Sequence, residues 1–491
     1  MNLSKSKYCD YLQCRKILWL DKNNPNVKEE SNNESILDNG TDVGIMAREL
    51  FPNHINIAYN DDLKVMINDT KNLLIIDKIV ITEASFVYKN NFCSVDILKK
   101  DGNNYELYEV KSSTEIKDIY YDDLAYQVYV LTSIGYNVTK ASIIYINSNY
   151  SRKGDLKLNE LFNIEDITDL ILSKQEEVEN NINEIEKYLT TDTELDEVDL
   201  HCFKPYPCPY FKYCTSHLND NNVFSIRRMT NNKKIELYKK KVTSYSDLLK
   251  EDIDLKFKQQ IEFELYDKEP YINVDKINEF LKEVHYPLYF LDFETFQQPI
   301  PMYDDVKPYM QIPFQYSLHY LENENSSLKH TDFLGDVNFD PRRMLAEKLV
   351  KDIPLDSCIV AYNMMFEKMV IKNLASMYSD LSNHLMNIHD NMIDLLVPFR
   401  NRDYYVKEMN GSYSIKYVLP ALFPNDEKLN YHNLELIHNG SEAMNAFYNL
   451  NNYSKEEQTS IRNNLLKYCE LDTYAMVKIW EKLKEVTKIH N

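Results

Sequence analysis

Short apolar runs separated by polar turns recur along the chain and predict alternating strands and helices. In the C-terminal half, Pro287–Leu291 (PLYFL) is an uninterrupted apolar run with the length of a buried strand. This half is predicted to contain strands at 287–293, 313–320, 328–334 and 357–362, a helix from Pro341, and then mostly helices. The alternation indicates an α/β fold.

The N-terminal half shows a different pattern, a meander of strands followed by one helix. The predicted strands are Leu73–Ile81, Ala84–Tyr88, Phe92–Leu98 and Tyr105–Lys111. The turn Lys100–Asn104 contains Asp-Gly, which is a strong hairpin signal. A helix at Asp122–Ile134 and a β-rich run at Ala141–Ile146 follow. The two halves therefore predict two different α/β domains.

The length of 491 residues is too great for one ordinary core. We expect a domain at 1–220, a charged helical connector at 221–284 and a domain at 285–491. No stretch reaches about 18 consecutive apolar residues, and no secretory leader opens the chain. These features predict a cytoplasmic protein with no membrane partner.

Two carboxylates follow the strand predicted at 287–293. Asp292 and Glu294 are two residues apart, so on a strand they point to the same side. Two like charges at a strand end are costly unless a cation lies between them, which favours a Mg²⁺ or Mn²⁺ site. The alternative is a solvated acidic turn. Far along the chain, Tyr468 and Asp472 are four apart in a helical pattern and share one face.

The order D-x-E, then Asn363 to Glu367 as N-x-x-F-E, then Y-x-x-x-D resembles the motifs of DEDD exonucleases in their tyrosine-bearing branch. The resemblance covers about residues 285–490 and implies an RNase H-like fold with 3′→5′ exonuclease activity. It implies that the metal ligands are Asp292, Glu294, Glu367 and Asp472, and that Tyr468 orients the attacking water. Glu367 stands where this family usually has Asp, and Asp394 is a substitute ligand to consider.

A second acidic pattern lies on the N-terminal meander. Glu109 and Lys111 form E-x-K on one strand and face the same way, and Asp96 lies on the neighbouring strand. Two carboxylates and an ammonium can hold a cation and activate a water beside a phosphate. The alternative is an exposed cross-strand ion pair. Gln127 lies on the following helix.

This order resembles the RecB-like branch of the PD-(D/E)xK nucleases. The resemblance implies a restriction-endonuclease-like fold with Asp96 and Glu109 as metal ligands and with Lys111 and Gln127 as further site residues. That branch often has a His on the preceding helix, whereas Thr41–Phe51 contains none. Glu49 or Glu83 is then expected to share its role.

Three of the eight cysteines, Cys202, Cys208 and Cys214, are evenly spaced among prolines and aromatic residues. Such a rigid loop suits a metal site, with Cys14 as the best fourth ligand and Cys9 as its rival. The distribution resembles the iron–sulfur RecB-like nucleases, including CRISPR-associated exonucleases. It implies a [4Fe–4S] cluster on Cys14, Cys202, Cys208 and Cys214, with Zn²⁺ as the alternative.

As a whole the chain resembles an uncharacterised bacterial family that fuses these two nuclease domains. The sequence therefore predicts a metal-dependent nuclease on single-stranded DNA or RNA, working with a helicase or with repair or defence partners. The formal net charge of −21 opposes nonspecific nucleic-acid binding. The alternatives are a nucleic-acid-binding scaffold with one or both nuclease folds inactive, and a phosphatase or nucleotide hydrolase.

Overall fold

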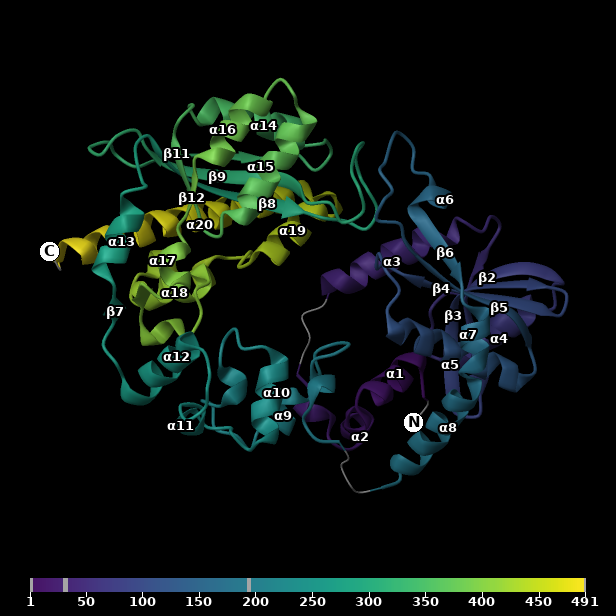
Figure 1. Cartoon of the computed structure of the whole chain (residues 1–491). Helices are drawn as coiled ribbons and strands as arrows, with labels where there is room; N and C mark the ends of the chain where they lie inside the picture. The colour runs from purple at the N-terminus through teal and green to yellow at the C-terminus, as the bar shows by residue number, and fades with distance from the viewer. Residues whose placement is uncertain (1–2, 30–33, 192–195, 490–491) are drawn as a thin grey trace. The chain divides into compact units, whose positions relative to one another are not determined.

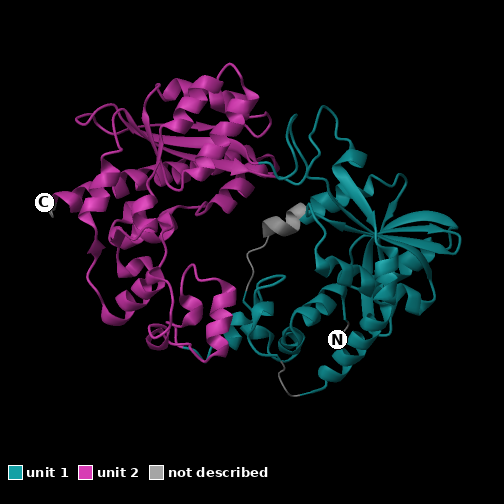
Figure 2. Cartoon of the chain, in the orientation of Figure 1, with its two compact units in different colours: residues 1–218, 298–310 teal, residues 219–297, 311–491 magenta. Residues whose placement is uncertain are grey.

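The computed structural model describes residues 3–29, 34–191 and 196–489. The chain forms two compact units, each with its own sheet (Figure 2). Unit 1 comprises residues 1–218 and 298–310, and unit 2 comprises residues 219–297 and 311–491. Within the described residues, no helix is both long and apolar enough to cross a membrane.

Unit 1 contains one mixed sheet with the strand order β1-β2-β3-β4-β5-β6. Its strands are β1 (Ile55–Asn56), β2 (Lys78–Tyr88), β3 (Asn91–Asp101), β4 (Asn104–Lys111), β5 (Asn137–Ile146) and β6 (Phe162–Asp166). Strands β2, β3 and β4 form the antiparallel meander, and β5 lies parallel to β4. Gly102 has a φ of +60° in the tight turn between β3 and β4, a conformation that glycine adopts without strain.

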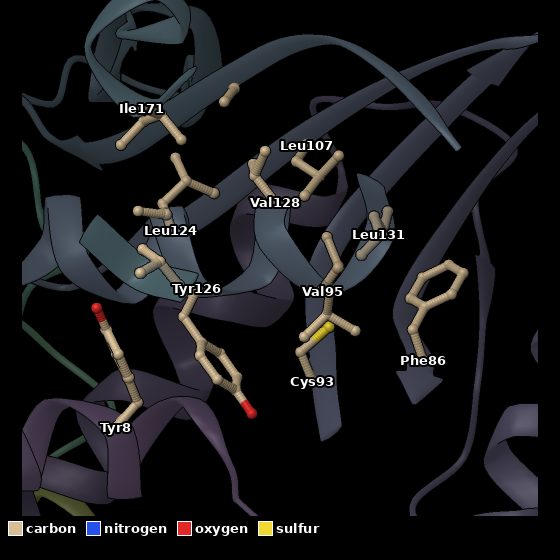
Figure 3. Close-up of a cluster of buried hydrophobic side chains, with 14 of the residues drawn as sticks. Tyr8, Phe86, Cys93, Val95, Leu107, Leu124, Tyr126, Val128, Leu131 and Ile171 are labelled. Atoms are coloured by element: carbon tan, nitrogen blue, oxygen red, sulfur yellow. The ribbon is translucent and has the colours of Figure 1, made fainter. Parts of the chain in front are cut away.

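Helix α5 (Asp118–Ile134) connects β4 to β5 and packs on the sheet. Figure 3 shows Leu124, Val128 and Leu131 of this helix among the strand residues Val95 and Leu107 of the same core. The other helices of unit 1 are α1 (Lys5–Gln13), α2 (Arg15–Asn23), α3 (Glu34–Arg48), α4 (Leu63–Leu73), α6 (Leu158–Leu161), α7 (Thr168–Ser173), α8 (Gln175–Tyr188) and α9 (Phe211–Cys214), with short 3₁₀ turns η1 (Pro25–Val27) and η2 (Leu200–Cys202).

Unit 2 contains a five-stranded mixed sheet with the order β10-β9-β8-β11-β12. Its strands are β8 (Leu288–Phe296), β9 (Ile312–Leu321), β10 (Lys329–Leu334), β11 (Cys358–Ala361) and β12 (Met392–Asp394). Strands β10, β9 and β8 are antiparallel, whereas β8, β11 and β12 are parallel. Strand β8 is therefore central.

Helices cover both faces of this sheet (Figure 1). Leu288 and Phe290 of β8 belong to one core, and Tyr289 and Leu291 belong to the other. Burial on both faces explains why β8 is a continuous apolar run rather than an alternating one. On one face lie α14 (Arg342–Asp352), α15 (Met365–Met377) and α16 (Ser382–Asp390); on the other lies the long helix α20 (Lys455–Ile489).

Smaller elements complete unit 2. They are α10 (Asn231–Lys239), α11 (Tyr245–Leu248), α12 (Leu255–Tyr266), α13 (Val274–Leu281), α17 (Val397–Arg400), α18 (Ile415–Leu422) and α19 (Gly440–Tyr448), the short sheet of β7 (Tyr271–Ile272) and β13 (Tyr404–Tyr405), and the 3₁₀ turns η3 (Val223–Ser225), η4 (Lys407–Met409), η5 (Glu427–Leu429), η6 (Tyr431–Asn433) and η7 (Leu450–Asn452).

The units divide near the expected boundary at residue 220, but the predicted connector 221–284 lies within unit 2. The loop 298–310, which joins β8 to β9, groups with unit 1 instead. Arg152 of unit 1 donates hydrogen bonds to the carbonyls of Pro301 and Met302, at 3.0 and 2.8 Å. The predicted strand at Leu73–Ile81 begins later than expected, because α4 continues through Leu73.

Candidate functional site

Three carboxylates meet at the centre of unit 2. Asp292 and Glu294 project from β8, and Asp472 projects from α20. Each offers an oxygen within 4.8 Å of the other two; among the described residues, no other set of three His, Cys, Asp or Glu side chains is this close. The sequence predicted these residues as metal ligands, and the fold brings them together.

All three carboxyls have raised pKa values, chiefly because they are buried. Burial, followed by the charges of Asp472 and Glu294, raises the pKa of Asp292 well above its usual value. Burial is also the largest cause for the other two, raising the pKa of Glu294 to about 8 and that of Asp472 to about 6. A divalent cation would remove this repulsion and lower these pKa values. The cluster therefore has the donor set of a hard-cation site.

Glu367 lies close to these three but outside their 4.8 Å group. It occupies the first turn of α15, is 3% exposed, and its Oε2 has no hydrogen-bond partner among the described residues. Burial raises the pKa of Glu367 to about 8, and its charge raises the pKa of Asp292. An unpaired, buried carboxylate oxygen is costly without a ligand, so Glu367 remains suited to the role of a fourth ligand.

Asp394, considered above as a substitute ligand, forms hydrogen bonds with the backbone. Its Oδ1 accepts hydrogen bonds from the backbone N–H groups of Asn363 and Leu396, at 2.9 and 3.1 Å. These bonds hold the ends of β11 and β12 together and engage the carboxylate in the backbone. Asp394 therefore has a structural role in this arrangement.

Two tyrosines lie against Asp472. Tyr468 precedes it by one turn of α20, and its hydroxyl also hydrogen-bonds Asp472, which lowers the pKa of that carboxyl. Tyr431 donates a hydrogen bond from its hydroxyl to Asp472 Oδ1 at 2.5 Å. The rings of Tyr431 and Tyr468 are 6.1 Å apart. Sequence reasoning found Tyr468 from its spacing to Asp472 but missed Tyr431, which lies in a loop with no such periodicity.

A cavity of about 920 Å³ lies beside this cluster. Its lining includes Lys416, Phe423, Tyr431, His432, His438 and Asn439. Tyr431 connects the cavity to Asp472 directly, and the charge of Lys416 lowers the pKa values of both Glu294 and Asp472. Lys416 is exposed, and its ammonium forms no ion pair with any described residue. It is therefore a cation free to meet an anionic ligand.

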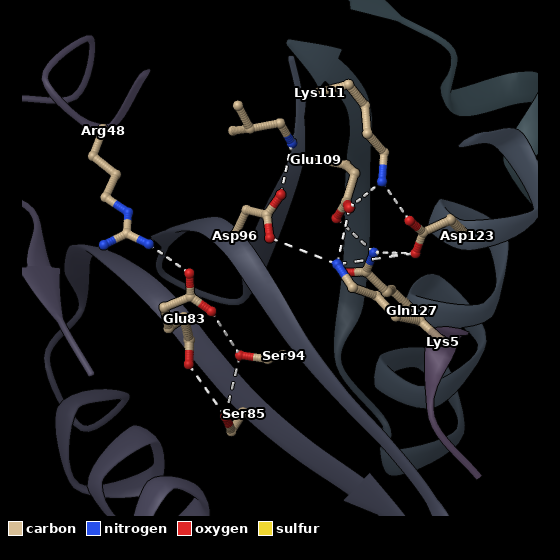
Figure 4. Close-up of polar contacts among 11 residues, drawn as sticks. Lys5, Arg48, Glu83, Ser85, Ser94, Asp96, Glu109, Lys111, Asp123 and Gln127 are labelled. Atoms are coloured by element: carbon tan, nitrogen blue, oxygen red, sulfur yellow. Dashed lines mark hydrogen bonds and ion pairs between the residues drawn. The ribbon is translucent and has the colours of Figure 1, made fainter. Parts of the chain in front are cut away.

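A second polar cluster forms in unit 1 (Figure 4). Asp96 lies on β3, Glu109 and Lys111 on β4, and Gln127 on α5. Lys111 Nζ is 2.7 Å from Glu109 Oε1, and Gln127 Nε2 donates to Glu109 Oε2 at 2.7 Å. Asp96 Oδ2 accepts from the backbone N–H of Val110 at 2.7 Å. All four predicted residues converge.

Two residues of this cluster were not predicted from the sequence. Asp123 of α5 accepts from Lys111 at 2.5 Å, and Lys5 of α1 lies 2.9 Å from Glu109 Oε1. The cations hold the pKa of Glu109 below its usual range although burial opposes this, whereas burial and the charge of Glu109 raise the pKa of Asp96 to about 7. Lys5 is 104 residues from Glu109 in sequence, so no local pattern signals it.

An ion pair lies near this cluster, at the end of the helix in which the sequence has no histidine. Arg48 Nη2 at the end of α3 lies 2.5 Å from Glu83 Oε1, and Ser94 donates to Glu83 Oε2 at 3.2 Å. The charge of Glu83 raises the pKa of Asp96, so Glu83 lies near the cluster. Glu49 is exposed. Of the two carboxylates considered as substitutes, Glu83 is the one that faces the site.

The four predicted cluster cysteines line one small cavity in unit 1. Cys14, Cys202, Cys208 and Cys214 all contribute to its wall, whereas Cys9 does not. Burial raises the pKa of Cys14 to about 12 and that of Cys208 to about 11, as expected for thiols in a dry enclosure. The remaining three cysteines, Cys93, Cys358 and Cys469, are buried, and Cys469 Sγ lies 3.8 Å from Asp292 Oδ2.

Comparison with known proteins adds a family relationship for part of unit 2. Residues 289–414 match the family described as "Domain of unknown function (DUF2779)". The matched stretch includes Asp292, Glu294 and Glu367. The chain is 27% identical over 216 residues to "Uncharacterized protein MG366" of Mycoplasma genitalium. That alignment covers 40% of this chain and 32% of the relative, so the chain spans about a third of the length of the curated relative it matches.

Proposed function

We propose that the protein is a metal-dependent nuclease whose unit 2 removes nucleotides from the 3′ end of single-stranded DNA or RNA. The observation that carries this proposal is the convergence of Asp292, Glu294 and Asp472 within 4.8 Å beside a cavity of about 920 Å³. The strand order β10-β9-β8-β11-β12, with the carboxylates on the central strand, supports an RNase H-like fold for unit 2.

Asp292, Glu294, Asp472 and Glu367 would hold Mg²⁺ or Mn²⁺. When bound, two such ions supply an activated water and stabilise charge on the leaving oxygen of a phosphodiester. The chain's own residues then position the reactants. Tyr431 fixes Asp472 by its hydrogen bond, and Tyr468 presents its hydroxyl to the same carboxylate.

The cavity would receive the terminal nucleotide. Phe423 and Tyr431 provide rings on which a base can stack irrespective of its identity, and Lys416 provides the charge that attracts a phosphate. This arrangement provides a local positive charge, although the formal net charge of the whole chain is −21. Local attraction of this kind answers the objection that an acidic protein binds nucleic acid poorly.

The test is degradation of a 5′-labelled single strand in the presence of Mn²⁺, with DNA and RNA compared. We expect a ladder that shortens from the 3′ end, and a loss of more than about 100-fold for Asp292→Asn and Asp472→Asn, since each removes several kcal/mol of charge stabilisation. Glu470→Gln is the matched control, because this exposed residue lies on α20 between Tyr468 and Asp472. Equal activity of all variants would end the proposal.

For unit 1 we propose a RecB-like fold that carries a [4Fe–4S] cluster. The meander β2-β3-β4, followed by α5 and the parallel strand β5, supports that fold. A tetrahedral Zn²⁺ needs sulfurs about 3.8 Å apart, since each Zn–S bond is about 2.3 Å. Cys14, Cys202, Cys208 and Cys214 line one small cavity, which supports a shared thiolate site for a [4Fe–4S] cluster, with Zn²⁺ as the alternative.

The visible spectrum of anaerobically purified protein tests this cluster. We expect a brown chromophore that Cys14→Ala and Cys208→Ala abolish and Cys9→Ala retains, because Cys9 does not line the cavity. A colourless protein that contains zinc would select the alternative metal. Loss of colour in Cys9→Ala but not in Cys14→Ala would reverse the choice of fourth ligand.

A further inference from the structure

Lys5 places an ammonium among the three carboxylates of unit 1. Its Nζ lies 2.9 Å from Glu109 Oε1, 3.6 Å from Asp96 Oδ1 and 4.0 Å from Asp123 Oδ1. Figure 4 shows that it enters the cluster from α1, a different element from the β4 strand that carries Lys111. The side chain of Lys5 is 25% exposed, whereas that of Glu109 is 1% exposed.

The fold holds Lys5 in this position from both sides. Before it, Leu3 forms backbone hydrogen bonds with Asn90 and Phe92, both at 2.8 Å, and accepts one from the Tyr126 hydroxyl at 2.8 Å. After it, the ring of Tyr8 stacks on Tyr126 with centroids 5.1 Å apart. Figure 3 shows Tyr8 and Tyr126 facing each other beside the core. The entry of Lys5 into the cluster therefore follows from an anchored N-terminal segment.

The ammonium lies between the two oxygens that a divalent cation would need. A cation bridging Asp96 and Glu109 must approach their oxygens to about 2.0–2.6 Å. Glu109 Oε1 already contacts both Lys5 and Lys111, and Glu109 Oε2 accepts from Gln127. Asp96 Oδ1 is the other oxygen that faces Lys5. The ammonium and a divalent cation therefore exclude each other from this point.

Gln127 supplies a second, independent indication that this cluster can bind a cation. It is completely buried, its Nε2 donates to Glu109 and Asp123, and its Oε1 has no hydrogen-bond donor among the described residues. A buried amide oxygen without a donor is costly unless a ligand completes it. It is an oxygen of the type that binds hard cations or their water.

We propose that Lys5 is a built-in competitor for divalent cations at the Asp96–Glu109 cluster. With Lys5 in contact with the carboxylates, its ammonium neutralises part of their charge, and the cluster binds Mg²⁺ or Mn²⁺ weakly. Removal of the Lys5 ammonium takes away its contacts with Asp96 Oδ1 and Glu109 Oε1, so that a cation can approach both oxygens and the unpaired Gln127 amide oxygen. The inference concerns cation binding alone and does not require that either unit cleave nucleic acid.

Mn²⁺ titration followed by electron paramagnetic resonance tests the proposal on the full chain. Asp292→Asn and Asp472→Asn together form the parent, so that unit 2 contributes no tight site. Lys5→Met, which keeps the length of the side chain and removes the charge, is expected to bind Mn²⁺ about tenfold more tightly or better. Adding Asp96→Asn to Lys5→Met should remove that gain. Lys7→Met, on the same helix, is the matched control and should change the affinity less than twofold.

Equal or weaker Mn²⁺ binding by folded Lys5→Met would overturn the proposal. A measurement on the parent also decides the question if Lys5→Met does not fold. The parent should show no tight Mn²⁺ site that is sensitive to Asp96→Asn, and finding such a site with Lys5 present would refute the competition. These Mn²⁺ affinities can be interpreted even if the nuclease assay shows no activity.

Discussion

Replacing Asp292 with Asn is expected to stabilise unit 2 when no divalent cation is present. Burial and the charges of Asp472 and Glu294 raise the pKa of Asp292 well above its usual value. In the unfolded chain an Asp titrates near about 3.9. Above that pH the folded protein retains a proton that the unfolded chain has lost, so stability falls as pH rises toward the folded pKa.

The size of the effect follows from the width of this window. Each pH unit inside it reduces the free energy of unfolding by about 1.4 kcal/mol. Between pH 5 and pH 8, the titration of Asp292 can therefore reduce the free energy of unfolding by at most about 4 kcal/mol. Asn carries no charge and avoids this loss. We expect the free energy of unfolding of Asp292→Asn to exceed that of the parent, and we expect this excess to grow between pH 5 and pH 8.

The chain offers a fluorescent reporter for this measurement. Its two tryptophans are Trp19 in unit 1 and Trp480 in α20 of unit 2, and Trp480 is 5% exposed. In a Trp19→Phe background, urea unfolding in EDTA followed by tryptophan emission reports on unit 2. The free energies of unfolding of parent and variant are then compared at the two pH values.

Divalent cations should reverse the order of stability. Mg²⁺ or Mn²⁺ binds only the folded cluster and stabilises the parent by mass action, while Asp292→Asn loses a ligand and gains less. If the variant is less stable than the parent in EDTA at pH 8, or if the difference does not grow between pH 5 and pH 8, the electrostatic reasoning is refuted. Glu470→Gln, which removes an exposed charge from α20, should show neither effect.

Three further outcomes test unit 2. Tyr431→Phe removes the 2.5 Å hydrogen bond that lowers the pKa of Asp472, so protons should compete better with the cation for this carboxylate and the acid limb of kcat/KM against pH should move upward. Lys416→Gln should raise the KM for a single-stranded oligonucleotide about three- to tenfold and flatten its salt dependence. Gly411→Ala should lower the free energy of unfolding by about 2 kcal/mol or more, measured by urea titration, because its φ is +74° and a Cβ would lie 2.1 Å from Gln260 Oε1.

Local spacing predicted the parts of both clusters that lie on regular elements. The i, i+2 pairs Asp292/Glu294 and Glu109/Lys111 share one side because strands alternate. The i, i+4 pair Tyr468/Asp472 shares one face because α20 is helical there. The continuous run in β8 also predicted a buried strand correctly, since both of its faces pack against helices.

The residues that sequence reasoning missed reach the clusters by tertiary packing. Lys5 comes from the anchored N-terminal helix and Tyr431 from a 3₁₀ turn. Asp123 comes from α5, in which the residues that follow it, 124–128, are all buried. Lys5 and Tyr431 have no neighbour at a diagnostic spacing, whereas Asp123 lies four residues before Gln127 on α5, a spacing that could have indicated it. Asp394 shows the converse, because the sequence made it a candidate ligand, yet its Oδ1 accepts hydrogen bonds from two backbone N–H groups.

The excursion of residues 298–310 into unit 1 affects how the protein can be divided for study. A fragment ending at residue 218 would lack the carbonyls of Pro301 and Met302 that satisfy Arg152, and Ile300, which packs against the core around Tyr108 and Phe162. Unit 1 produced alone would expose that apolar patch to water and leave the Arg152 guanidinium with only the Gly154 carbonyl of its acceptors. The two halves are therefore better studied by silencing one site at a time within the intact polypeptide.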